Sequence, residues 1–180
     1  MLIFNTYIKT LLGELILKIN AMKKSKYTWL LDAGHGGIID GEYQTAGKRS
    51  PEFEFGQYFE GVGNRMIVKN MLAQCKVLGI DAIDIVDSDE DISLKERVKR
   101  ANNLHTQKKN CIYVSIHSDA FSNPQANGYS VYTSVGNTAS DAVATTFLDT
   151  MKEYFPDHTS RHDNSDGDAD KEAQFYVLKY

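Results

Sequence analysis

The sequence predicts an α/β domain with a twisted, mostly parallel sheet and helices on both of its faces. Short apolar runs rich in β-branched and aromatic residues alternate with longer segments of helical period, which is the pattern that builds βαβ units. A length of 180 residues with 42% hydrophobic residues is typical of one globular domain with its own core. The net charge of −4 gives no general attraction to nucleic acid, so we expect no nucleic-acid partner.

The first 21 residues are compatible with three interpretations. Their apolar residues have helical spacing, but polar and charged residues interrupt them too often for a transmembrane segment. The stretch also lacks the basic start, the unbroken apolar run and the cleavage site of a secretory signal. It is a helix packed on the domain, an interfacial anchor, or a leader outside the reading frame. In the last case Met22 is the start. In all three cases we expect the folded domain to span residues 22–180.

The elements of the domain follow in order along the chain. A strand at Tyr27–Leu31 runs into the glycine-rich segment 32–37, and the segment Ile38–Phe59 has no period and is expected to be a loop. The remaining elements are a helix from about Val62 to Leu78 ended by Gly79, a strand Ile80–Val86, a helix after the N-cap Ser93, a strand Cys111–Ile116, a strand Gly128–Thr133, a helix after Thr138, and a strand Phe175–Leu178.

Two further patterns are interpreted as structural. Cys75 and Cys111 stand in apolar surroundings without metal-binding spacing, so both are expected to be core thiols. The acidic segment from Asp157 to Glu172 has the Asp-x-Asp spacing of calcium loops. However, it lacks the fixed glycine, the closing glutamate and the flanking helices of an EF-hand, so we expect a solvated surface loop.

Two histidines follow strands of the predicted sheet, His35 after the first and His117 after the third. Because ligands bind outside the carboxyl ends of parallel strands, the two side chains can converge. Imidazole is a common metal ligand, and the glycines on either side of His35 allow another group to approach closely. The alternative is that each histidine caps its strand or makes a local hydrogen bond.

A catalytic zinc bound by two histidines commonly takes a carboxylate as its third protein ligand. The candidates are Glu42, Glu52, Glu54 and Glu60. Glu60 is the best placed because it lies at the start of a helix, where the backbone is rigid, although an acidic residue there also simply complements the helix dipole. Motifs of serine hydrolases, phosphate-binding loops and His-Glu-x-x-His metalloproteases are absent from the sequence.

Five segments of the sequence resemble, in their order, the zinc-dependent N-acetylmuramoyl-L-alanine amidases of the amidase 3 type. They are Leu31-Asp32-Ala33-Gly34-His35-Gly36-Gly37, Glu60 with Asn64, Leu94-x-x-Arg97-x-x-x-Ala101-Asn102, Val114-Ser115-Ile116-His117-Ser118-Asp119-Ala120 and Phe175-Tyr176-Val177-Leu178. The resemblance covers about Tyr27 to Tyr180. It implies a six-stranded sheet and one Zn²⁺ held by His35, Glu60 and His117. It also implies cleavage of the amide between N-acetylmuramic acid and L-alanine in peptidoglycan, while Arg97 and Asn102 brace the fold.

Two features depart from the family pattern. The gap between His35 and Glu60 is longer than usual, so Ile38–Phe59 is an insertion expected to shape substrate access or the sugar side of the groove. In the family, the strand begun by Phe175 leads to a last strand with the catalytic glutamate in a Val-Glu-x-Gly-Phe-like segment, and no such segment is present. The domain is therefore expected to be C-terminally incomplete, with this glutamate beyond Tyr180, and no catalytic or substrate-binding residue is assigned.

Three functions remain open from the sequence. In the first, the chain is an amidase whose catalytic glutamate lies beyond Tyr180, and it acts at the cell wall, in the periplasm or outside the cell, by an unknown export route. Alternatively, it is a zinc-bearing cell-wall binding or regulatory module without activity. The third alternative is an unrelated zinc peptidase, which requires the ordered motifs to be coincidental.

Overall fold

The structure is a computed structural model that describes residues 25–119, 125–165 and 167–180. These residues form two compact units, one that ends at Ser118 and one that runs from Asp119 to Tyr180, and each is described by itself. The expectations for residues 1–21 lie outside the described residues. Within the described ranges, no helix is both long enough and apolar enough to cross a membrane.

The first unit is built on a three-stranded parallel sheet. Its strands are β1 (Thr28–Ala33), β4 (Ala82–Asp84) and β5 (Cys111–Ile116), in the order β4-β1-β5. Both β4 and β5 run parallel to β1, the central strand. The carboxyl ends of β1 and β5 therefore lie at the same edge of the sheet, as the sequence predicts.

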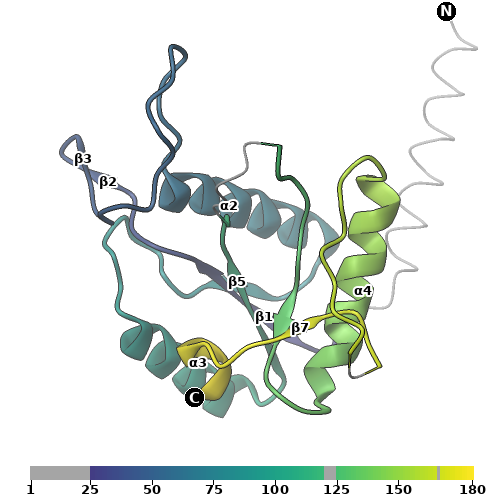
Figure 1. Cartoon of the computed structure of the whole chain (residues 1–180). Helices are drawn as coiled ribbons and strands as arrows, with labels where there is room; N and C mark the ends of the chain where they lie inside the picture. The colour runs from purple at the N-terminus through teal and green to yellow at the C-terminus, as the bar shows by residue number, and fades with distance from the viewer. Residues whose placement is uncertain (1–24, 120–124, 166) are drawn as a thin grey trace, which may run out of the picture. The chain divides into compact units, whose positions relative to one another are not determined.

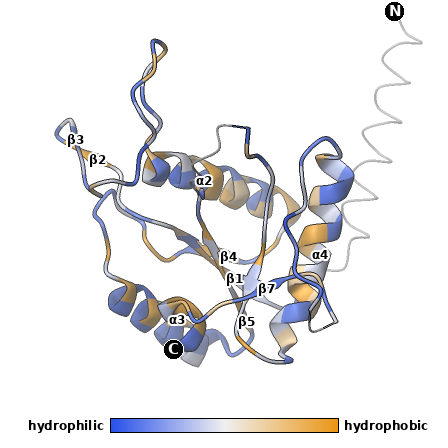
Figure 2. Ribbon diagram, in the orientation of Figure 1, coloured by the Kyte–Doolittle hydropathy of each residue, from blue (hydrophilic) through white to orange (hydrophobic). Residues whose placement is uncertain are grey.

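Helices cover both faces of this sheet, which confirms the predicted layering (Figure 1). The helices are α2 (Glu60–Leu78) and α3 (Leu94–Lys108). Leu30 of β1 packs on one face in a cluster with Ala101 of α3, whereas its neighbour Leu31 packs on the other face with Val68 of α2. Figure 2 shows apolar and polar residues interleaved along both helices, as expected of helices that place one face against a sheet.

The helix ends agree with the sequence signals. Gly79 ends α2 in the left-handed conformation, with a φ of 66°. The side chain of Ser93 caps α3 and accepts a hydrogen bond from the backbone N–H of Glu96 at 3.2 Å. The cysteines are free thiols and both are only partly buried, with Cys111 packed against the cluster around Leu30.

The segment Ile38–Phe59 is more regular than the expected loop. It begins with a hairpin of β2 (Ile38–Ile39) and β3 (Glu42–Tyr43), joined by Asp40 and Gly41, whose φ values are 51° and 83°. Two positive φ values at an Asp-Gly pair are typical of a type I′ hairpin turn. The strands are too short to show a period of two, and the Asp-Gly signal alone marks the turn.

A second hairpin follows, which we call the aromatic arm and define as residues 49–59. Its ends pair at the bridge between Arg49 and Phe59, and its tip closes between Phe53 and Gly56. The arm projects beyond the N-terminal end of α2 (Figure 1). The rings of Phe53 and Phe55 stack with centroids 5.1 Å apart, and Phe55 is 90% exposed. The insertion thus presents aromatic side chains to solvent.

The second unit contains a parallel strand pair and one long helix. Its elements are β6 (Tyr132–Thr133), α4 (Ala139–Tyr154), β7 (Lys171–Glu172) and the short α5 (Tyr176–Lys179), with β6 paired to β7. Thr138 and Asp141 form a complete capping box at the start of α4. Ala144 and Leu148 form the buried side of this helix.

Two expectations for this unit are wrong. Phe175–Leu178 does not form a strand, because Tyr176–Lys179 is the helix α5 and Leu178 N–H donates to the carbonyl of Phe175. A continuous apolar run of four residues fits a helical turn as well as a strand, so periodicity could not separate the two. The acidic segment is also not solvated throughout, since Asp170 is buried.

Candidate metal centre

The structure brings the three predicted ligands together. His35 lies on the turn after β1, Glu60 is the first residue of α2, and His117 directly follows β5. Glu60 Oε1 lies 3.2 Å from His35 Nε2 and 3.2 Å from His117 Nδ1. One potential ligand atom from each residue lies within 4.8 Å of the others. These three side chains are therefore close enough to bind one metal ion.

Burial differs among the three side chains and affects the pKa of His35. The Glu60 side chain is 8% exposed, whereas that of His117 is 42% exposed. Burial lowers the pKa of His35, while the charge of Glu60 opposes this effect. Burial thus favours the neutral imidazole of His35, which is the form that binds metals.

The glycine-rich turn makes room for the imidazole of His117. A Cβ atom added at Gly34 would lie 2.7 Å from His117 Nδ1 and still closer to the other two ring atoms nearest to it. Gly61 similarly packs against the carbonyl oxygen of Gly36, so the first turn of α2 lies directly on this segment. The glycines are used here for close approach, as the sequence predicts.

We expect Gly34→Ala to lower the affinity for zinc at least tenfold, because the added methyl group displaces the His117 ring from Glu60. Zinc titration of the purified variant measures this loss, with far-UV circular dichroism as the test of folding. Gly79→Ala is the matched control. Its Cβ meets nothing within 4 Å, but its φ of 66° strains an alanine, so it should cost stability and keep zinc. Equal zinc affinity in Gly34→Ala and the wild type would contradict this role.

The backbone at His35 is held in an unusual conformation by two arginines. Its φ is 66°, in the left-handed region that non-glycine residues rarely adopt. Arg65 Nη1 donates to the carbonyl of His35 at 2.9 Å, and Arg97 Nη2 donates to the same oxygen at 3.1 Å. The neighbouring carbonyl of Gly34 accepts from Asn64 Nδ2 at 3.1 Å. These donors hold the turn in the conformation that places the His35 imidazole beside Glu60.

Arg97 also forms a buried ion pair with Asp32. The Asp32 carboxylate accepts two further hydrogen bonds, from Tyr113 Oη at 2.5 Å and Ser115 Oγ at 2.7 Å. Burial raises the pKa of Tyr113, and the charge of Asp32 raises it further, so the phenol remains a donor. The expectation that Arg97 braces the fold is confirmed by these contacts.

Glu60 is positioned by the segment that precedes it and by the backbone after β5. Its N–H donates to the carbonyl of Lys48 at 3.0 Å, and the N–H of Gly61 donates to Tyr43 Oη at 3.0 Å. The N–H of Ser118 donates to Glu60 Oε1 at 3.0 Å. The hairpin insertion therefore satisfies the first backbone donors of α2 and fixes the residue from which the carboxylate projects.

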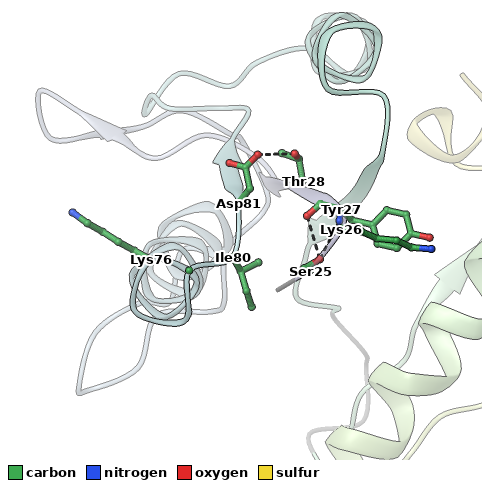
Figure 3. Close-up of a pocket in the computed structure, with 8 residues that line it drawn as sticks. Ser25, Lys26, Tyr27, Thr28, Lys76, Ile80 and Asp81 are labelled. Atoms are coloured by element: carbon green, nitrogen blue, oxygen red, sulfur yellow. Dashed lines mark hydrogen bonds between the residues drawn. The ribbon is translucent and has the colours of Figure 1, made fainter. Parts of the chain in front are cut away.

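Two hollows lie at opposite ends of the strands. A cavity of about 320 Å³ beside His35 and His117 is bounded by Arg97 and the start of α3. The other, of about 450 Å³, lies at the amino end of β1 (Figure 3). In the latter, the Thr28 hydroxyl donates to Asp81 Oδ2 at 2.7 Å, and no group of metal-ligating side chains is found among its described residues. The cavity beside the histidines is therefore the better candidate for a catalytic site.

The other glutamates considered from the sequence do not join the group. Glu42, Glu52 and Glu54 are exposed residues of the two hairpins and are not members of the cluster with the histidines. Sequence reasoning missed Arg65, and it gave Ser118 no role beyond its place in the segment around His117. The contacts of both residues with the site are polar and long-range in sequence. A single arginine in an amphipathic helix carries no pattern that separates it from a solvated residue.

Comparison with known proteins identifies the family. A family model described as N-acetylmuramoyl-L-alanine amidase matches residues 30–180. The N-acetylmuramoyl-L-alanine amidase AmiA of Salmonella typhimurium is 33% identical over 120 residues, which are 67% of this chain and 37% of that protein. AmiA of Escherichia coli is 33% identical over 124 residues, 68% of this chain and 38% of that protein. The chain thus spans little more than a third of the length of these curated relatives.

Solved structures have the same fold. The catalytic domain of CwlV, an N-acetylmuramoyl-L-alanine amidase from Bacillus (Paenibacillus) polymyxa, superposes with a TM-score of 0.58 at 25% identity, over 85% of this chain and 73% of that one. The amidase AmiC2 of Nostoc punctiforme gives a TM-score of 0.62 at 23% identity, over 87% and 74% of the two chains. With the match over residues 30–180, these findings establish that the chain belongs to the N-acetylmuramoyl-L-alanine amidase family.

Proposed function

We propose that this chain is a zinc-dependent hydrolase that cleaves the amide bond between N-acetylmuramic acid and L-alanine in peptidoglycan. The observation that carries the proposal is the convergence of His35, Glu60 and His117 within 4.8 Å of one another. Membership of the amidase family supports the choice of reaction and substrate. Because peptidoglycan lies outside the cytoplasm, the proposed place of action is the cell wall, the periplasm or the outside of the cell.

The donor set fits zinc better than the other common protein metals. Two imidazole nitrogens and one carboxylate oxygen are a typical set of three protein ligands in catalytic zinc sites, which keep a further position open. Calcium and magnesium prefer all-oxygen sites, so two histidines argue against them. The half-exposed imidazole of His117 and the adjacent cavity of about 320 Å³ leave room for substrate beside the donors.

The residues of the chain hold the site in a fixed arrangement. His35, Glu60 and His117 would hold the ion, which when bound polarises the scissile carbonyl and lowers the pKa of a bound water to about 7. The N–H of Ser118 orients the Glu60 carboxylate, and the guanidinium groups of Arg65 and Arg97 fix the backbone of His35. Such fixed supporting contacts keep ligands in place without reorganisation during the reaction.

The proposal is tested with purified peptidoglycan. The zinc-loaded chain should release new N-terminal alanine and free lactyl carboxylate on muramic acid, and the apo-protein should release neither. Bound zinc without these products would contradict hydrolase activity of this 180-residue chain. It would fit a zinc-bearing wall-binding or regulatory module, or the absence of the family's catalytic glutamate from residues 1–180. Cleavage of other peptide bonds in the stem would instead favour a zinc peptidase.

We also propose that the aromatic arm contributes to binding the wall polymer on the sugar side of the site. The arm adjoins the metal centre, because Tyr58 Oη lies 2.9 Å from the hydroxyl of Ser118, the residue after His117. At its tip, Phe53 and Phe55 stack and are exposed. Exposed aromatic rings offer flat apolar faces against which the C–H groups of a sugar ring can pack.

Replacing Phe53 and Phe55 together by serine is expected to weaken binding to insoluble peptidoglycan about tenfold, the effect of losing roughly 1.4 kcal/mol. Zinc content and stability should change little, because Phe53 is 45% exposed and Phe55 is 90% exposed. A cosedimentation assay measures the binding. Tyr154→Ala removes an exposed aromatic of the other unit and serves as the control. If the double variant binds and cleaves the wall like the wild type, the arm has no such role.

A further inference from the structure

The second unit contains an acidic cluster that the amidase chemistry does not use. Asp141, Asp168 and Asp170 each place a carboxylate oxygen within 4.8 Å of the other two. Asp141 lies in the first turn of α4, whereas Asp168 and Asp170 lie in the segment that leads into β7. All three belong to the unit that begins at Asp119. Residues far apart in the sequence thus bring three acidic side chains together.

Asp170 distinguishes this cluster from an ordinary acidic surface. The residue is only 2% exposed. Its Oδ2 accepts a hydrogen bond from the Thr133 hydroxyl, but its Oδ1 is buried and has no hydrogen-bond partner among the described residues. A buried carboxylate oxygen without a donor is costly, since no contact at that oxygen offsets its desolvation. Asp170 Oδ1 therefore lacks a hydrogen-bond donor or a cation among the described residues.

Asp141 is held in place by the capping box of α4. Its Oδ2 accepts from the N–H of Thr138 at 2.6 Å and its Oδ1 accepts from the Thr138 hydroxyl at 2.7 Å. These hydrogen bonds lower the pKa of Asp141, so the carboxylate is ionised at neutral pH. Each carboxylate oxygen keeps a second lone pair, so Asp141 can cap α4 and bind a cation at the same time.

We propose that Asp141, Asp168 and Asp170 form a calcium site, separate from the metal centre at His35. The donors are carboxylate oxygens only, which Ca²⁺ prefers and which zinc sites with nitrogen ligands do not resemble. A bound cation would supply the missing partner of Asp170 Oδ1 and neutralise the mutual repulsion of three carboxylates.

The cation would connect three segments of the unit. Asp170 contacts Thr133 at the end of β6, Asp141 opens α4, and Asp168 belongs to the acidic loop before β7. The short β6 and β7 strands make few ladder hydrogen bonds of their own, so a cross-link at their ends should stabilise this unit substantially.

The test is calcium binding by the full chain after loading with one equivalent of zinc, which fills the centre at His35. Isothermal titration with CaCl₂ should give one site with a dissociation constant of about 10⁻⁵ to 10⁻³ M, and saturating Ca²⁺ should raise the melting temperature by about 5 °C. Asp170→Asn should lower the affinity at least tenfold. Without calcium, this variant should melt no lower than the wild type, because the amide removes a buried charge.

Two further variants keep the test decisive. Asp168→Asn should lose calcium affinity as Asp170→Asn does, which guards against a folding defect peculiar to one position. Asp163→Asn alters an exposed aspartate of the same segment that lies outside the cluster, and it should bind calcium like the wild type. Failure of the wild type to bind calcium, or unchanged binding by Asp170→Asn, would overturn the proposal. Neither result would bear on zinc or on amidase activity.

Discussion

His117→Ala is expected to lower the affinity for zinc by more than 100-fold and to leave the purified chain without stoichiometric metal. The variant removes one of the three side chains that meet at the carboxyl edge of the sheet, and even residues that only support metal ligands cost 10–100-fold when removed. His35→Ala should behave in the same way. Zinc is quantified by elemental analysis after gel filtration.

The matched control for these variants is His105→Ala. His105 is an exposed residue of α3 and is not a member of the metal-ligating group, so its removal should leave one zinc bound per chain. All three variants should keep a folded circular dichroism spectrum, since neither His35 nor His117 belongs to the buried apolar core. Full zinc occupancy in His117→Ala would defeat its assignment as a ligand.

Arg97→Met is expected to have the largest effect on stability, a loss of about 3–5 kcal/mol of unfolding free energy. The methionine fills most of the space of the arginine stem but leaves the Asp32 carboxylate buried without its cation. It also removes donors to the carbonyls of Ala33 and His35. Chemical unfolding followed by far-UV circular dichroism measures the loss, and zinc affinity should fall with it.

Lys99→Met provides the comparison on the same helix. Lys99 pairs with Glu96 at 3.6 Å, but its side chain is 68% exposed, so the pair is screened by solvent. Exposed ion pairs of this kind contribute about 0–1 kcal/mol. If Arg97→Met were no more destabilising than Lys99→Met, the buried network around Asp32 would not hold the turn at His35 as described.

The convergence of His35 and His117 was predictable because it follows from sheet geometry. Parallel strands place their carboxyl ends at one edge, so histidines after two such strands meet there whatever the length of chain between them. Glu60 was predictable because the first residue of a helix is held rigidly at a defined point. The helices α2 and α3 were predictable from their period and from the signals at Gly79 and Ser93.

The contacts that hold the ligands were not predictable from the sequence. Arg65 looks like an ordinary polar residue of an amphipathic helix, whereas Asn64 belongs to a segment that resembles the amidases. Only the fold shows that the two side chains donate to the carbonyls of His35 and Gly34. Asp170 could not be separated from the exposed acids around it, because burial depends on the packing of β6 and α4. The hairpin at Asp40-Gly41 was indicated by its turn residues, but its two-residue strands are too short for a periodic signal.

The central claim is that one zinc ion is held jointly by His35, Glu60 and His117. Crystals of the zinc-loaded chain, measured at the zinc absorption edge, test it most directly. Joint binding by the three side chains predicts an anomalous peak within about 2.0–2.2 Å of a nitrogen of His35, a nitrogen of His117 and a carboxylate oxygen of Glu60. A zinc ion coordinated by other residues would contradict joint binding by these three side chains. So would a zinc ion that leaves any of the three outside coordination distance.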